Sequence, residues 1–477
     1  MTMTMTIRNY LRAGILSLTS AVALLAQTTP WQLTTLTDFS SVGFDGGANP
    51  FSGVAIGKGG VLYGTAPSTY QGGGDGVVYA LKPPPSPGGS WTEEVLYAFP
   101  AWDPSQGLRP FGGLVIGAGG VLYGTTSEGG AFGVGAVFSM TPPASSNDWW
   151  TETVLYSFTG GSDGADPQTT LVTGAGGVLY GTTNFGGTGP CYPYEQTPGC
   201  GTVFSLTPPE SPGGTWTETV LHTFTSGADG ALPNGLAIGA NGVLYGTTQD
   251  YGTLPCPDLP GCGTVFSLTP PASSGGSWTS QTIYRFTGSP HDGAHPLAGV
   301  AVAGGLLFGS TSQGGPGFGT VFSLTPPAQP GGVWTERILY DFVNPLIEGM
   351  DPSGITLGRN GVIYGISQAG GSLRNGTVFS LTPPSAPEGS WTAQVLCTFT
   401  GGNDGSAPFG TLVIGNSGAL YGTTYEGGGQ ASGTVFELKP QTGGALTILP
   451  LFPPSQTIQA KNNSFQPKTD RWFAHYE

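Results

Sequence analysis

A heptapeptide of the form GVLYGTT, found at residues 120–126, recurs in recognisable form seven times and constrains the fold more than any other feature. The aromatic residues of successive copies are 60, 57, 65, 63, 56 and 57 residues apart, at Tyr63, Tyr123, Tyr180, Tyr245, Phe308, Tyr364 and Tyr421. A fixed period of this size indicates a repeat architecture, in which each unit buries its faces only by packing on its neighbours. We therefore expect one closed array rather than about three separate domains.

One unit contains four predicted strands, which we call A, B, C and D. In the second unit they span residues 111–116, 121–126, 136–141 and 150–158, with a tight hairpin turn (GAGG) between A and B. Strands A, B and C are runs of apolar and small residues, which is typical of a sheet covered on both faces. Four short antiparallel strands per unit predict the blade of a β-propeller, because the coils of the alternative, a parallel β-solenoid, are much shorter.

The tryptophan that opens strand D also occurs seven times, and the first copy, in residues 31–39, precedes every A strand. We predict that this segment pairs with the C strand at 434–438, so that both ends of the chain close a seven-bladed ring and leave no open edge. Residues 445–452 compete for the same place, but they lack the tryptophan and contain Pro450, which cannot donate to a strand ladder.

The first residues have the pattern of a secretory signal, with Arg8 and Arg12 before an apolar run at 14–26. A membrane anchor is the alternative, although this run is short for a membrane span. We expect cleavage after Ala26, with Ala23 as the second choice, and a mature chain that is secreted, extracellular or periplasmic, without a membrane span. The predicted division is a signal peptide at 1–26, a seven-bladed propeller at 27–452 and an irregular tail at 453–477.

The charge balance argues against a nucleic-acid partner. Only 13 Lys and Arg stand against 28 Asp and Glu, which gives a formal net charge of −15 and no basic run. The 85 glycines and 42 prolines recur at fixed places in the units, so they indicate turns rather than disorder.

The combination of LYGTT at 179–183 with GTVF at 201–204 resembles the bacterial GloVer (Gloeo_Verruco) tandem repeat. The resemblance covers residues 31–452, and seven copies make it specific. It implies a secreted or surface-directed bacterial protein, but no biochemical activity. Members of such a family often end in a C-terminal sorting signal, and residues 461–477 contain no anchor-like segment, so we expect release rather than attachment.

Four cysteines bracket insertions in two neighbouring B–C loops. In a secreted chain we expect local disulfides, Cys191 with Cys200 and Cys256 with Cys262. Zinc is the alternative, but no histidine lies near these cysteines. Cys397 replaces a D-strand tyrosine and is predicted to be a buried free thiol.

An acidic residue followed by glycine recurs in the turn from strand D to the next strand A. Aspartate fills five of the seven positions, with Gln106 and Glu348 as variants: Asp45, Asp163, Asp229, Asp292 and Asp404. Such an aspartate accepts hydrogen bonds from its own turn, and this structural role is favoured because it repeats in each unit. Alternatively, a ring of carboxylates could hold a cation or sugar hydroxyl groups.

The two stapled loops are where the units differ most, and they are predicted to rise beside the acidic turns of one face. Rigid loops that carry aromatic and acidic side chains suit carbohydrate binding, whereas simple loop drift is the alternative. The candidate binding residues are Phe185, Tyr192, Tyr194, Glu195, Tyr251 and Asp258, together with Asp163, Asp229 and Asp292 of the turns.

Little in the sequence supports catalysis, because His222, His291, His295 and His475 occupy unrelated positions of the units. We expect no metal and no cofactor. The preferred function is a monomeric, non-enzymatic scaffold that binds surface polysaccharide or another surface protein. The alternatives are a glycan-degrading enzyme with carboxylates at the channel mouth and a purely structural envelope protein.

Overall fold

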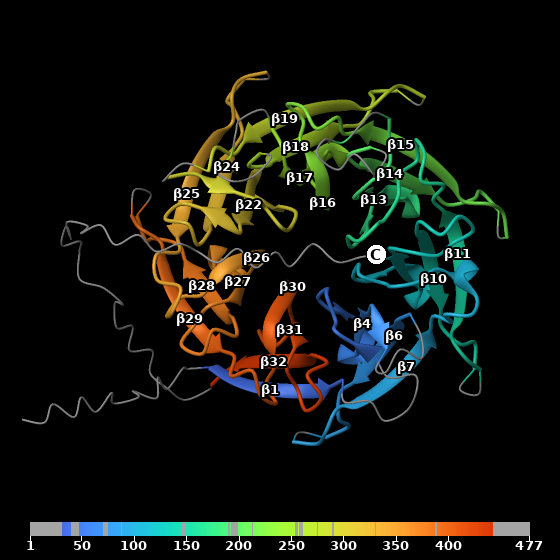
Figure 1. Cartoon of the computed structure of the whole chain (residues 1–477), viewed down its shortest axis with the longest axis horizontal. Helices are drawn as coiled ribbons and strands as arrows, with labels where there is room; N and C mark the ends of the chain where they lie inside the picture. The colour runs from blue at the N-terminus through green and yellow to red at the C-terminus, as the bar shows by residue number, and fades with distance from the viewer. Residues whose placement is uncertain are drawn as a thin grey trace, which may run out of the picture.

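Seven four-stranded antiparallel sheets surround a common centre as the blades of a β-propeller (Figure 1). The computed structural model describes residues 31–39, 47–69, 75–86, 88–145, 148–188, 191, 199–211, 213–252, 256, 261–273, 275–288, 291–329, 331–386 and 389–441. The predicted fold class is therefore confirmed. The proposed signal peptide and C-terminal tail lie outside the described residues.

Within each blade the strands follow one another from the centre of the ring outward. Blades 1 to 3 consist of β3 (Ala55–Ile56), β4 (Leu62–Ala66), β6 (Val77–Lys82) and β7 (Thr92–Ala98); β8 (Val115–Ile116), β9 (Leu122–Thr126), β10 (Ala136–Thr141) and β11 (Thr151–Ser157); β12 (Val172–Thr173), β13 (Leu179–Thr183), β14 (Thr202–Thr207) and β15 (Thr217–Thr223). Blades 4 to 6 consist of β16 (Ala231–Ile238), β17 (Leu244–Asp250), β18 (Thr264–Thr269) and β19 (Thr279–Arg285); β21 (Ala301–Ala303), β22 (Leu306–Thr311), β24 (Thr320–Thr325) and β25 (Thr335–Asp341); β26 (Met350–Leu357), β27 (Ile363–Ala369), β28 (Thr377–Thr382) and β29 (Thr392–Thr398). Blade 7 consists of β30 (Ser406–Ile414), β31 (Leu420–Glu426), β32 (Thr434–Pro440) and β1 (Trp31–Asp38).

The innermost strand is shorter than the sequence predicts in four blades. Strand A was expected at 111–116, but β8 contains only Val115–Ile116. In blade 2 residues 110–114 do not pair with strand B, and the ladder begins at Val115 opposite Tyr123. In blades 4, 6 and 7 the inner strand is longer and contains a register shift after the equivalent proline instead.

The turn between strands A and B is a short 3₁₀ turn in most blades. In blade 2 it spans Ala118–Gly120, and Gly119 and Gly120 have φ values of 70° and 83°. A left-handed backbone is accessible to glycine without a steric penalty, which explains the Gly-Gly pair at this point. Asn241 takes the same conformation in blade 4 with φ 57°.

The core lies between the blades and is built from two repeated aromatic pairs. The phenylalanine after each D strand packs edge-on against the C strand of the next blade; Phe99 and Phe138, for example, have ring centroids 5.2 Å apart. The tryptophan of strand D contacts the B-strand tyrosine of the previous blade, as Trp150 does with Tyr63 at 5.9 Å. Aromatic pairs of this geometry add about 0.5–1.5 kcal/mol each beyond their burial, so the repeat fixes the packing angle of neighbouring blades.

Strand β1 closes the ring. It pairs antiparallel with β32 from Trp31 opposite Pro440 to Asp38 opposite Thr434, and Trp31 contacts Tyr364 of blade 6 at 6.0 Å. Figure 1 shows the blue β1 along the outer side of the red β32. The predicted closure by residues 31–39 is therefore confirmed, whereas the competing segment 445–452 lies beyond the described part of the chain.

The D–A turns and the B–C loops lie side by side on one face, which we call the loop face. Two small sheets join them directly: β2 (Gly47–Ala48) pairs with β5 (Ser68–Thr69), and β20 (Gly293–Ala294) pairs with β23 (Gln313–Gly314). In blade 3 the same contact is a bridge between Ala165 and Phe185. The A–B turns and the links from C to D lie on the opposite face.

Candidate functional site

The three aspartates predicted as binding residues are acceptors for their own turns. Asp163 accepts hydrogen bonds from the backbone N–H and the hydroxyl group of Thr159, at 2.8 and 2.5 Å, and from the Tyr156 hydroxyl group at 2.9 Å. Asp229 and Asp292 bind the preceding threonines in the same way. The side chains of Asp163 and Asp292 are 7% and 6% exposed, which leaves little carboxylate surface for a ligand.

Two other predicted residues lie beside these turns. Half-buried Phe185 exchanges two backbone hydrogen bonds with Ala165, next to the Asp163 turn. Tyr251 has a positive φ of 65° and packs against the hydrophobic cluster that contains Cys191 and Cys200. The structure therefore brings residues of both stapled loops to adjoining blades of the loop face. The remaining loop candidates, Tyr192, Tyr194, Glu195 and Asp258, lie outside the described residues.

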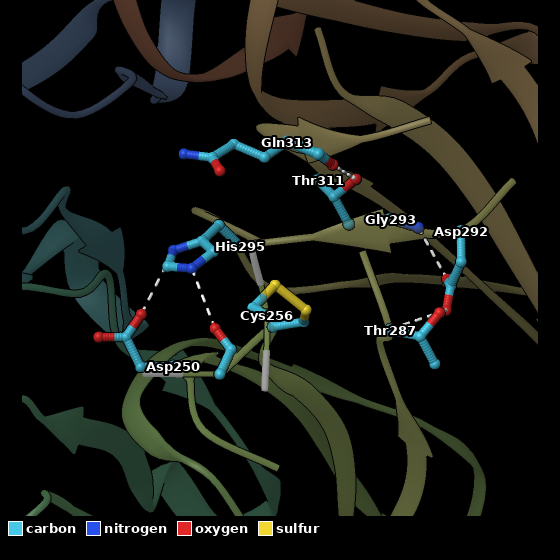
Figure 2. Close-up of a disulfide and its surroundings, with 10 residues drawn as sticks. Asp250, Cys256, Thr287, Asp292, Gly293, His295, Thr311 and Gln313 are labelled. Carbon is cyan, nitrogen blue, oxygen red and sulfur yellow. Dashed lines mark hydrogen bonds and ion pairs between the residues drawn. A yellow bond between two sulfur atoms is a disulfide. The ribbon is translucent and has the colours of Figure 1, made fainter. Parts of the chain in front are cut away.

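Both predicted disulfides are present. Cys191 pairs with Cys200 and Cys256 pairs with Cys262, with Cα atoms 5.0 and 5.2 Å apart, and Cys397 is a buried free thiol as predicted. The second disulfide lies under the turn that holds Asp292, since a Cβ atom on Gly288 would be 2.9 Å from each sulfur. Figure 2 shows this disulfide between the Asp292 turn and His295. The staple therefore supports the turn as well as its own loop.

His295 joins blade 4 to blade 5 beside this disulfide. Its Nδ1 lies 3.3 Å from Asp250 Oδ1 and its Nε2 lies 3.1 Å from the carbonyl oxygen of Gly261 (Figure 2). Burial lowers the pKa of His295, and Asp250 and Gly261 oppose that effect. A histidine–aspartate pair can serve as a general base, but both ring nitrogens are directed at protein oxygens in this structure. The pair therefore orders the stapled loop rather than presenting a free base.

His295 belongs to a ring of seven residues that was not predicted from the sequence. Each has a φ between 49° and 58°, precedes a proline and donates its N–H across the junction to the preceding blade: Asn49, Arg109, Asp166, Leu232, His295, Asp351 and Ala407. The backbone role repeats, but the side chains all differ apart from the two aspartates. The variable residue before an invariant proline is the sequence signal that could have identified this position as a functional candidate.

The residue after the same proline forms an aromatic cluster near the centre of the ring. Phe51 stacks on Phe409 with centroids 3.9 Å apart and contacts Phe111 and Tyr425 edge-on at 5.3 and 6.0 Å. All four rings are half-buried, and they belong to blades 7, 1 and 2. We call them the central aromatic group.

In the next two blades an amide side chain replaces the phenylalanine at this position. The equivalent residues of blades 3 and 4 are Gln168 and Asn234, whose amide groups donate to Asp166 and to the carbonyl oxygen of Pro296. These are the same blades that carry the stapled loops. One side of the loop face thus combines aromatic rings, amides and rigid loops.

Two exposed aromatic side chains extend this surface outward. Trp102, in the turn before blade 2, is 84% exposed, and Phe132, in the B–C loop of blade 2, is 61% exposed. The turn and the loop touch through a 2.8 Å hydrogen bond from Gly130 N–H to the Pro104 carbonyl oxygen. The other units have no aromatic residue at these two positions, so the sequence could have identified Trp102 and Phe132 as candidates.

Three D-strand glutamates have strongly perturbed acidity at the outer junctions between blades. Burial, with a neighbouring turn acid as the second cause, raises the pKa of Glu152 and Glu218 to about 7 and that of Glu336 to about 8. In each of them Oε1 is buried and has no hydrogen-bond partner within the described structure. A raised pKa suits a general acid, but the same buried oxygen recurs in three blades, which favours a structural role in the junctions.

No three His, Cys, Asp or Glu side chains gather as metal ligands in the described ranges. The described residues also contain no helix that is long and apolar enough to cross a membrane.

Comparison with known proteins gives distant similarities that indicate no function. No curated protein matches the sequence. Similar solved structures include a glucose dehydrogenase, with 14% identity, a TM-score of 0.42 and coverage of 85% of this chain and 99% of that chain. The PQQ domain of pyranose dehydrogenase from Coprinopsis cinerea has 12% identity, a TM-score of 0.42 and coverage of 86% and 95%. PorZ, a surface component of the type-IX secretion system of Porphyromonas gingivalis, has 14% identity, a TM-score of 0.46 and coverage of 85% and 49%.

The repeat itself identifies the family. The model of the Gloeobacter/Verrucomicrobia repeat matches residues 24–194 and 251–470, which together make up most of the chain. This agrees with the seven recognisable copies of the LYGTT and GTVF patterns that build the B and C strands of the blades. The chain belongs to the Gloeobacter/Verrucomicrobia repeat family.

Proposed function

We propose that this protein is an extracellular, non-enzymatic scaffold that binds a polysaccharide on its loop face. The observation that carries the proposal is the central aromatic group, in which Phe51 lies among Phe111, Phe409 and Tyr425. Flat aromatic rings offer an apolar surface to the C–H face of a sugar, and neighbouring amides can bind its hydroxyl groups. Gln168 and Asn234 supply such amides in the next two blades.

The stapled loops support the same conclusion. A disulfide in each of two adjacent loops, with His295 held between Asp250 and Gly261, reduces the conformational freedom of this surface before a ligand arrives. Less ordering upon binding leaves more of the contact energy as affinity. The two disulfides also support an extracellular location, because such bonds persist in oxidising compartments.

A glycan array tests the proposal with the purified full chain. We expect binding to one or a few polysaccharide classes, reduced at least tenfold when the insertion between Cys191 and Cys200 is shortened to the length of the blade 2 loop. Trp149→Ala is the matched control, because Trp149 is 86% exposed and lies on the opposite face. The absence of binding to any glycan on the array would overturn the proposal. Loss of binding in the Trp149 variant would also overturn it, because the glycan would then bind the face opposite the loop face.

A further inference from the structure

A cavity of about 220 Å³ lies between blades 5 and 6, away from the central aromatic group. Its walls come from β25, from the turn that follows β25, and from β28 and β29; among the lining residues are Tyr340, Ile347, Glu348, Phe379, Trp391 and Ala393. On the same measure a single water needs only about 10–15 Å³, so a small organic molecule fits.

The cavity exists because one side chain of the repeat is missing. Ala393 occupies the second position after the D-strand tryptophan, where blades 1, 2, 3 and 5 have glutamate: Glu93, Glu152, Glu218 and Glu336. In blades 2, 3 and 5 the glutamate lies close to the tyrosine of the preceding D strand, as the effects of Glu152 on Tyr97, of Glu218 on Tyr156 and of Glu336 on Tyr284 show. In blade 1 a threonine takes the place of that tyrosine, and Glu93 accepts a hydrogen bond from Thr37. At the junction of blades 5 and 6 the methyl group of Ala393 leaves that space open.

One wall of the cavity carries a carboxylate that is only partly satisfied. Glu348 is 6% exposed, and its Oε2 accepts hydrogen bonds from the backbone N–H groups of Val343 and Asn344 at 2.9 and 3.2 Å. Its Oε1 is buried and meets no donor in strict hydrogen-bond geometry among the described residues, although the hydroxyl group of Tyr340 is close enough to hydrogen-bond with this carboxylate. The hydroxyl group of Tyr340 lies near this carboxylate, which raises the pKa of Tyr340 further after burial has raised it.

No positive charge compensates this carboxylate, since no lysine or arginine is among the described residues that line the cavity. A buried carboxylate oxygen without a well-placed donor is costly. The neutral hydroxyl group of Tyr340 does not offset the negative charge, so the site is complementary to a ligand that brings a positively charged donor.

The other walls are aromatic or aliphatic. Trp391 and Tyr340 supply rings on two sides, and Ile347 closes the wall next to Glu348. Val343, Leu346 and Ile347 of the same turn are 55%, 52% and 41% exposed. The faces of Trp and Tyr rings attract cations, and the apolar turn suits the carbon skeleton of the same ligand.

We propose that this cavity is a binding site for a small organic cation, namely a primary ammonium group on an apolar body. The ammonium group donates a hydrogen bond to Glu348 Oε1 and lies against the rings of Trp391 and Tyr340, while the body contacts the apolar turn. A neutral hydroxyl compound satisfies the same oxygen but gains nothing from the negative charge or from the aromatic faces. The site is separate from the polysaccharide surface and does not depend on it.

Titration calorimetry of the full chain with benzylamine and with its neutral counterpart benzyl alcohol tests the proposal. We expect benzylamine to bind at least tenfold more tightly than benzyl alcohol. Glu348→Gln, which keeps an acceptor for the turn N–H groups but removes the charge, should weaken benzylamine binding at least tenfold. Ala393→Glu, which restores the usual side chain of the repeat, should fill the cavity and abolish binding.

Ser280→Glu is the matched control, because Ser280 occupies the same position of the repeat in blade 4. It should leave benzylamine binding unchanged, and the unfolding midpoint of each variant shows that the ring is intact. The proposal is overturned if benzylamine does not bind, if benzyl alcohol binds equally well, or if folded Ala393→Glu binds benzylamine as tightly as the natural chain. Glucosamine and glucose extend the comparison to sugars: tighter binding of glucose would show a site for neutral hydroxyl groups instead.

Discussion

Replacing Glu336 with glutamine should stabilise the protein in alkaline solution and leave it unchanged in acid. Burial in the junction, followed by the charges of Asp292 and Asp341, raises the pKa of Glu336 from 4.5 to about 8. In the unfolded chain the side chain ionises near 4.5, so the folded state binds the proton more tightly between these values. The stability that results is complete below pH 4.5 and is lost as the pH rises through 8.

The size of the effect follows from the same values. The difference between 4.5 and about 8 corresponds to about 5 kcal/mol at about 1.4 kcal/mol per pH unit. Glu336 is only half-buried, so water screens much of this, and we expect about 2 kcal/mol at pH 9. At pH 4 the carboxyl group is mostly protonated in both states, and the variant should nearly match the natural chain.

Urea unfolding of the natural chain and of Glu336→Gln at pH 4 and pH 9 measures this difference. The variant should have the larger free energy of unfolding at pH 9 alone. Glu426→Gln is the control, because Glu426 is exposed on β31. Its free energy of unfolding should differ from that of the natural chain by the same small amount at pH 4 and at pH 9. The reasoning is refuted if the Glu336 variant and the natural chain have the same free energy of unfolding at pH 9. It is also refuted if their free energies differ by the same amount at pH 4 and pH 9.

Three further outcomes are expected. Trp31→Ala should lower the free energy of unfolding by about 2–3 kcal/mol, since it removes the contact between β1 and Tyr364; a loss no larger than that of Gln32→Ala, measured by urea unfolding, would contradict the closure energetics. Replacing Cys256 and Cys262 by serine should cost about 2 kcal/mol from loop entropy, and a variant as stable as the natural chain in the same assay would argue against it. His295→Gln should reduce the loss of stability as the pH falls from 7.5 to 5.5, because a buried histidine with a lowered pKa favours the unfolded, protonated state below its ordinary value of 6.5; identical pH profiles would contradict this.

The fold could be read from the sequence because each blade repeats the same physical constraints. The LYGTT and GTVF strands are buried on both faces, and Trp31 repeats the inter-blade contact of the other D-strand tryptophans, so the place of residues 31–39 in blade 7 was readable. The exact length of strand A was not readable, because the same Pro-x-Gly pattern lies outside the strand in blade 2 and inside it in blades 4, 6 and 7.

The candidate site was less readable because it depends on departures from the repeat. The central aromatic group combines Phe409 of the last blade with Phe51 of the first, and only ring closure brings them to a centroid distance of 3.9 Å. The cavity between blades 5 and 6 depends on what Ala393 lacks rather than on a motif. The acidic turns were easy to recognise in the sequence because they repeat. Their carboxylates accept hydrogen bonds from their own turns, so the repeat indicated a structural role rather than a binding site.

The affinity of the chain for its best array glycan, measured by titration calorimetry with and without two aromatic faces, tests the central claim most directly. Phe51→Leu combined with Phe409→Leu keeps apolar side chains at the centre of the ring but removes the stacked pair. At about 0.5–1.5 kcal/mol per aromatic contact, we predict a loss of affinity of tenfold or more. If the folded double variant binds the glycan as tightly as the natural chain, the central aromatic group is not the polysaccharide site.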